Sequence, residues 1–74
     1  MFDNFTFKIT KHIGTIARHD TGWAMELNLV SWNGKEPKYD IREWDESHIR
    51  MSRGITLKDD EMKKLIEILK TLEV

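Results

Sequence analysis

The first part of the chain alternates apolar and polar residues with a period of two, which is typical of strands with one buried face. Apolar residues occupy every second position of Phe5–Ile9, and apolar character resumes over residues 15–17, beyond Gly14. A glycine inside a strand indicates a bulge or a sharp bend. A turn signal at residues 20–22 then separates this strand from a second one, expected over about residues 23–32.

Two more strands are expected after the second one. Leu29 and Val30 are adjacent apolar residues, so strict alternation breaks within the second strand, which is compatible with a bulge. The dipeptide Asn33-Gly34 is the strongest short hairpin signal, and a third strand follows it over about residues 38–44. After a polar connection, Ile55–Leu57 is expected to form a short fourth strand.

From Asp59 the apolar period changes to that of a helix. The apolar positions at helical spacing are Met62, Leu65, Ile66, Leu69 and Leu72. Acidic residues at 59–61 suit the positive end of a helix dipole, and Ile68 widens the apolar stripe. We expect the helix to cover one face of the sheet, and it carries more apolar surface than that face requires. Four strands followed by one helix predict a single α+β domain over residues 1–74.

The length of the chain favours an oligomer. A domain of 74 residues is marginal alone and usually relies on disulfides, a metal or a partner. The absence of cysteine excludes disulfides and thiolate metal sites. His12, His19 and His48 lack the paired spacing of a local metal motif, so no metal and no other cofactor is expected. A symmetric homodimer through the helix would bury its spare flank and leave the opposite sheet faces free.

The charge balance is ordinary for a soluble domain, at net −1 with 34% charged residues. No apolar run approaches the ~20 residues of a membrane span. Residues 1–4 lack the order of a secretory signal, so we expect a cytoplasmic protein without a membrane partner. Many nucleic-acid-binding domains are basic. Any positive surface on this chain must therefore come from segregating charge between faces.

The sequence offers little for catalysis. Carboxylates crowd residues 40–46, but a general acid–base pair needs a closed pocket, for which four strands and one helix leave little room. The serines at 31, 47 and 52 lack a nucleophile-elbow context, and there is no glycine-rich phosphate loop. We therefore expect neither an enzyme nor a small-molecule substrate.

Three tryptophans in 74 residues are a high density, although an indole often packs in a core. Trp32 is followed by Lys35 and Lys38, and Trp44 shares a strand face with Lys38 and Arg42. Aromatic rings interleaved with cations suit unpaired nucleic acid, because bases stack on the rings and cations neutralise phosphates. Whether Trp23 and Trp44 lie in the core or on a binding face stays open.

Arg50 and Arg53 lie just before Gly54, either as solvated loop residues or as phosphate clamps at the edge of the aromatic face. The candidate nucleic-acid-binding residues are Trp32, Lys35, Lys38, Arg42, Trp44, Arg50 and Arg53. The candidate dimer-interface residues are Met62, Ile66, Ile68, Leu69 and Leu72.

Several of these runs resemble a known family. Lys38–Trp44, Arg53–Leu57 and the acidic-started helix look like the positive-cofactor-four family, which includes single-stranded-DNA-binding transcriptional coactivators of eukaryotes. The longer run Val30–Arg42 resembles the short bacterial branch, the YdbC-like proteins. The resemblance implies a curved four-stranded antiparallel sheet, one C-terminal helix, a homodimer formed through that helix and part of the sheet, and single-stranded DNA lying in the sheet grooves.

By position, Arg42 matches the DNA-contacting arginine of the family's Ile-Arg-Glu strand, and Arg53 matches the basic residue before the family's glycine. Trp32 and Lys35 lie near the family's aromatic and basic hairpin positions. Eukaryotic members have two aromatic residues after Arg-Glu, whereas this chain has one and then Asp45, so one family contact is lost.

The sequence thus predicts a DNA-binding, transcription-coactivator-like protein that binds single-stranded DNA without sequence preference, in transcription regulation, replication or repair. RNA stays open as a ligand, because no residue is identified that reads a 2′-hydroxyl. The alternative is a protein–protein interaction domain of the same fold that has lost the nucleic acid. The net charge and Asp45 favour that alternative.

Overall fold

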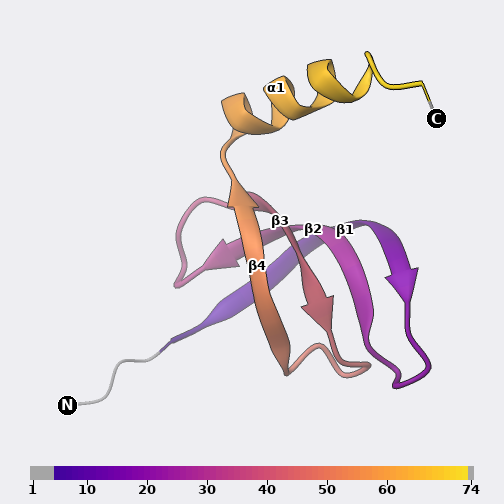
Figure 1. Ribbon diagram of the computed structural model, residues 1–74. Helices are drawn as coiled ribbons and strands as arrows, with labels where there is room; N and C mark the ends of the chain where they lie inside the picture. Colours follow the sequence, from indigo (N-terminus) through magenta and orange to yellow (C-terminus); the bar gives the residue numbers. More distant parts are fainter. Residues whose placement is uncertain (1–4, 74) are drawn as a thin grey trace.

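The computed structural model describes residues 5–73, which form an open antiparallel sheet of four strands followed by one helix (Figure 1). The elements are β1 (Phe7–Arg18), β2 (Ala24–Trp32), β3 (Lys38–Trp44), β4 (Met51–Leu57) and α1 (Asp59–Leu69). The sheet order is β1-β2-β3-β4, so each strand pairs with its neighbour in sequence. The predicted α+β architecture is confirmed. Residues 1–4, on which the expectation of no secretory signal rests, lie outside the described part.

β1 is one continuous strand that contains three irregularities in its pairing with β2. The register shifts occur between Ile9 and Lys11, between His12 and Gly14, and between Thr15 and Ala17. Each extra residue bends the strand and increases its twist. β2 alternates between buried and half-buried positions from Ala24 to Ser31, so the irregularity lies in β1 and not at Leu29 and Val30. Those two neighbours are both apolar because both faces of the sheet are apolar at that point.

The curvature of the sheet brings its opposite ends together on one side. Phe7 pairs with Trp32 at one end of β2, and Trp44 pairs with Ala24 at the other end. Nevertheless the rings of Phe7 and Trp44 lie 5.3 Å apart, centroid to centroid. Only a sheet that curls toward this side allows that contact, so we call this side the concave face.

The two faces of the sheet are unequally covered. The buried residues, all on the concave face, are Ala24, Glu26, Asn28, Val30, Asp40 and Trp44. The opposite side, the convex face, carries the apolar residues Met25, Leu27, Leu29, Tyr39, Ile41, Ile55 and Leu57, together with Ser31 and Glu43. Ile55 is 61% exposed, and the other six apolar residues, Ser31 and Glu43 are half-buried. Unusually, the concave face holds the buried polar residues, and the convex face is mainly apolar and open.

The helix α1 does not cover a face of the sheet, which corrects the expectation that it would. Lys58 joins it to β4 in an extended conformation, and Figure 1 shows the helix beyond the end of β4. Its first turn is fixed by Glu61, whose carboxylate accepts the Lys58 backbone N–H at 2.8 Å. The helix packs sparsely against β3, and none of its residues is buried. In residues 5–73, no helix has the length and apolar character to span a membrane.

Candidate nucleic-acid interface

Four aromatic side chains form a continuous row on the concave face, which we call the aromatic row: Phe5, Phe7, Trp32 and Trp44. The ring of Trp32 lies 6.0 Å from that of Phe5 and 6.1 Å from that of Phe7, between centroids. These separations are those of favourable aromatic pairs. Phe5 is 59% exposed, whereas Trp44 is fully buried. The aromatic row therefore runs from the surface into the core.

Arg42 packs against the ring of Trp32 in the aromatic row. Its guanidinium carbon lies 4.5 Å from the Trp32 ring centroid, a cation–π contact. Its Nε and Nη2 donate to the two carboxylate oxygens of Asp40 at 2.6 and 2.7 Å, and Nη1 donates to the Ser52 carbonyl at 3.3 Å. Only 13% of the Arg42 side chain is exposed. Asp40 thus neutralises the guanidinium and holds it where it braces Trp32, with little surface left for a phosphate.

Gly54 leaves the space through which the Arg42 side chain passes. A Cβ atom at residue 54 would lie 2.9 Å from Arg42 Nε, 2.5 Å from the Ile41 carbonyl oxygen and closer still to Arg42 Cβ. Thr56, two residues further along β4, donates its hydroxyl to Asp40 at 2.9 Å. The spacing of glycine and threonine in β4 is therefore matched to the ion pair on β3.

A polar chain crosses the concave face around Glu26. Its carboxylate accepts Asn28 Nδ2–H at 3.0 Å and lies 2.9 Å from His48 Nε2. His12 Nδ1 lies 2.7 Å from Asn28 Oδ1. Burial raises the pKa of Glu26, but the hydrogen bonds from Asn28 and His48 and the charges of His48 and His12 outweigh it and hold the pKa below its ordinary value. Within residues 5–73, no three His, Cys, Asp or Glu side chains are placed to hold a metal ion.

The structure places Trp44 in the core, which departs from the expectation that its ring would stack on a base. The residue is fully buried between the ring of Phe7 and that of His48, whose centroid lies 5.8 Å away. The curl of the sheet closes over this position, so the indole has no face open to a ligand.

The lysines and remaining arginines of the predicted site are all exposed. Lys35 and Lys38 are exposed on the hairpin that carries Trp32. Arg53 is exposed on the edge strand β4. Arg50 is exposed in the loop after β3, at the opposite end of that strand from Lys38. The fold therefore brings Trp32, the two lysines and the braced arginine together, and it separates Arg50 from them.

Two members of the aromatic row, Phe5 and Phe7, were missing from the residues singled out from the sequence. Their spacing of two residues predicts a shared face, but the same pattern describes any buried strand. Their packing on Trp32 depends on the curl of the sheet and on a contact between Thr6 and the turn at Asn33. The one available signal was a pair of phenylalanines at alternate positions of the first strand.

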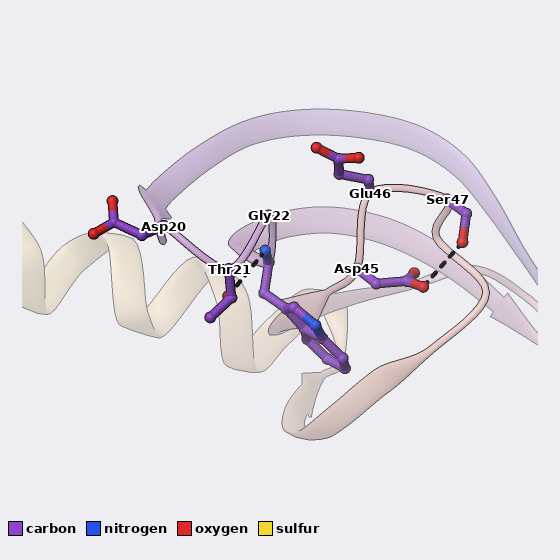
Figure 2. Close-up of a pocket in the computed structure, with 7 residues that line it drawn as sticks. Asp20, Thr21, Gly22, Asp45, Glu46 and Ser47 are labelled. Atoms are coloured by element: carbon purple, nitrogen blue, oxygen red, sulfur yellow. Dashed lines mark hydrogen bonds between the residues drawn. The ribbon is translucent and has the colours of Figure 1, made fainter.

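A different environment surrounds Trp23. A hollow of about 450 Å³ lies between the turn after β1 and the loop after β3, and Trp23 is part of its lining. Figure 2 shows the residues that line this hollow. Three carboxylates also line it, from Asp20, Asp45 and Glu46. Phosphates would be repelled from this hollow, so Trp23 is not grouped with the aromatic row.

Asp45, the residue at the position of the lost aromatic, organises the loop after β3. Its Oδ1 accepts the backbone N–H groups of Ile49 and Arg50 at 3.0 and 3.1 Å, and its Oδ2 accepts the Ser47 hydroxyl at 2.9 Å. Desolvation raises the pKa of Asp45, but these hydrogen bonds and one from the His48 backbone hold it below its ordinary value. These bonds also explain why β4 begins at Met51, earlier than predicted: the tight loop returns the chain early.

Comparison with known proteins agrees with this architecture. The chain matches the transcriptional coactivator p15 (PC4) family over residues 19–68, which is more than half of its length, and it belongs to that family. An uncharacterized protein of Treponema pallidum (strain Nichols) is 36% identical over 72 residues, which are 97% of this chain and 85% of that protein. The family match includes β2, β3, β4 and nearly all of α1, whereas β1 lies outside it.

Proposed function

We propose that the protein binds single-stranded DNA without sequence preference, through Trp32 and the basic rim of the concave face. The observation that carries the proposal is Trp32, braced by the Arg42–Asp40 pair and flanked on its own hairpin by exposed Lys35 and Lys38. Membership of a transcriptional coactivator family supports it. The role of such a protein lies in transcription regulation, or in replication or repair, where single strands are also exposed.

The chemistry of the interface is stacking and charge neutralisation. A base stacked on an indole contributes about 1–3 kcal/mol whatever its identity, since every base has a π-face. Lys35 and Lys38, exposed on the hairpin that carries Trp32, would neutralise phosphates next to such a base. Because duplex DNA keeps its bases stacked inside the helix, the site favours single strands. No residue of the site has a role in bond making or breaking.

We further propose a homodimer formed through the convex face and the helix. Exposed apolar side chains occur on the sheet, where Ile55 is 61% exposed, and on the helix and the turn after it. They comprise Ile66 (41% exposed), Ile68 (52%), Leu69 (50%) and Leu72 (56%), with half-buried Met62 beside them. Exposed apolar side chains in such number mark an interaction site when they gather into one surface, and we propose that they do so in the dimer. A symmetric pair would cover it and leave both concave faces open to DNA.

The test is fluorescence anisotropy of labelled oligo-dT of about twenty nucleotides, titrated across a salt series, beside a duplex of equal length. We expect submicromolar binding of the single strand, much weaker duplex binding and a steep loss of affinity with salt. Lys38→Ala should reduce the salt slope by about one, for one phosphate contact. Arg42→Ala should weaken binding with little change of slope, because Asp40 already neutralises its charge. Absence of single-strand binding at low salt would overturn the proposal.

A second function is favoured by one observation. Arg42 is neutralised by Asp40, and Glu26 adds a further carboxylate to the concave face, so the face carries less positive charge than its sequence suggests. A protein–protein interaction domain does not need a strongly positive face. If oligo-dT binding is weak and indifferent to Lys38→Ala and Arg53→Ala, this second function becomes the better account.

A further inference from the structure

The N-terminal end of the described chain is fastened to the turn between β2 and β3. The Asn33 backbone N–H donates to the Thr6 carbonyl at 2.8 Å. In return, the Thr6 backbone N–H donates to the Asn33 side-chain oxygen Oδ1 at 2.9 Å. Asn33 has a φ of 52°, a left-handed conformation that asparagine tolerates better than most residues. These two reciprocal bonds extend the pairing of β1 one step beyond Phe7.

The two hydrogen bonds between Thr6 and Asn33 determine where Phe5 lies. Residues on either side of Thr6 point to the same face, so Phe5 and Phe7 both lie against Trp32. The rings of Phe5 and Trp32 are close to parallel, with 29° between their planes and 6.0 Å between centroids. Phe5 is nevertheless 59% exposed. The residue thus presents an open aromatic surface directly beside Trp32 and on the same end of the sheet as the hairpin lysines.

We propose that Phe5 is a second base-stacking residue, so that the N-terminal strand is a working part of the DNA interface. This inference rests on the proposed function. Phe5 extends the aromatic surface of Trp32 toward solvent, at the end of the aromatic row opposite the buried Trp44. Phe5 and β1 both lie outside the part of the chain that matches the family. Phe5 therefore supplies an aromatic surface from a segment that the family match does not include.

The first experiment compares two oligomers of equal length, one of oligo-dT and one of abasic sugar-phosphate units. Phe5→Ala should raise the dissociation constant for oligo-dT about tenfold, which corresponds to one lost stacking contact. It should leave binding of the abasic oligomer and the salt slope for oligo-dT unchanged. Phe5→Tyr should keep the parent affinity, and Phe5→Leu should not, because leucine is apolar without a π-face.

The matched control is Ile16→Ala, which removes a similarly exposed apolar side chain from β1, the strand that follows Phe5, at 56% exposed against 59%. It should leave oligo-dT binding unchanged. A second variant, Asn33→Gly, keeps the left-handed turn but removes the Oδ1 acceptor. It should weaken oligo-dT binding only through Phe5, so the double variant should bind like Phe5→Ala alone.

The results distinguish a failure of this inference from a failure of the proposed function. If the parent binds oligo-dT and Lys38→Ala weakens binding, but Phe5→Ala binds like the parent, the stacking role of Phe5 is wrong and the proposed function stands. Equal weakening toward both oligomers would show that Phe5 merely supports the fold, and would also overturn the inference. If the parent binds neither oligomer, the proposed function fails, and the inference fails with it.

Discussion

The concave and convex faces are built from alternate residues of the same strands, yet the concave face buries polar side chains and the convex face exposes apolar ones. The concave face buries Glu26, Asn28 and Asp40, each satisfied by named partners. The convex face leaves apolar residues such as Ile55 in solvent. The curl of the sheet closes the first face on itself, and the helix fails to cover the second. The side of the sheet that is complete within one chain is therefore the polar one.

This difference assigns separate tasks to the two faces. A closed polar network with an aromatic rim is rigid and charged, which suits a nucleic acid. An open apolar surface gains free energy from burial against another protein, at roughly 25 cal/mol per Å². Substitutions in the aromatic rim of the concave face should consequently weaken DNA binding and spare the dimer, and substitutions on the apolar surface should do the reverse.

The largest effect is expected at the buried ion pair of the concave face. Asp40→Ala leaves the Arg42 guanidinium without its partner in a site where 13% of the side chain is exposed. We expect a loss of about 3–5 kcal/mol in the free energy of unfolding, measured by urea denaturation. Asp40→Ala combined with Arg42→Met should cost less than Asp40→Ala alone, because no buried charge is left unpaired. A larger cost for the double variant would contradict this account.

In the proposed dimer interface, Leu69→Glu places a charge on the apolar surface of the helix. We expect the dimer dissociation constant to rise about thirtyfold or more, the effect of an interface residue worth about 2 kcal/mol. Sedimentation velocity over a concentration series measures it. Glu67→Ala, a change on an exposed polar position of the same helix, should leave the dimer intact. A parent that stays monomeric at high concentration would remove the dimer proposal.

Gly54→Ala tests the close approach between β3 and β4. The added Cβ would overlap Arg42 and the Ile41 carbonyl, so we expect a loss of about 2 kcal/mol in stability, in the range for overpacking. Gly14→Ala is the matched control, since a Cβ there meets nothing within 4 Å. Thermal unfolding of both variants gives the comparison. Equal costs at the two glycines would show that backbone propensity, and not the Arg42 contact, governs residue 54.

Trp32→Ala should weaken oligo-dT binding about tenfold and leave the dimer unchanged. The loss comes from stacking, so the salt slope should change little. Trp23→Ala removes an indole from the acidic hollow at the other end of the sheet and should bind oligo-dT like the parent. Anisotropy and sedimentation on the same samples measure both properties. A similar loss in both variants would mean that tryptophan content, and not position, explains binding.

The smallest effect is the pH dependence that Glu26 contributes. Its pKa is held below its ordinary value in the folded chain, so the unfolded chain binds more protons in that range. Its stabilisation is complete above the ordinary pKa of a glutamate and is lost as the pH falls through the lower, folded value. Urea denaturation from pH 6 to pH 3 should show a smaller acid loss for Glu26→Gln than for the parent. Identical profiles would contradict the prediction.

The order of elements and the Asn33-Gly34 turn followed from local patterns, because periodicity and turn chemistry are local properties. The turn has positive φ at both residues, 52° and 73°, and a 3.0 Å bond from the Lys35 N–H to the Trp32 carbonyl. The shared face of Lys38, Asp40, Arg42 and Trp44 was also predictable, since side chains alternate along a strand. The burial of Trp44 in the core was not predictable, because a buried Trp44 and a Trp44 open to a base fit the same alternation.

The sequence by itself determined which residues share a face, where the chain turns, which family it belongs to and that the helix carries surplus apolar surface. Only the tertiary structure decided that β1 curls over the concave face, that Asp40 neutralises Arg42, and that Phe5 joins Trp32 at the surface. The physical reason is the range of the interactions. Alternation and turn preference act between neighbours, whereas three bulges in one strand bend a whole sheet and bring together residues that no local pattern connects.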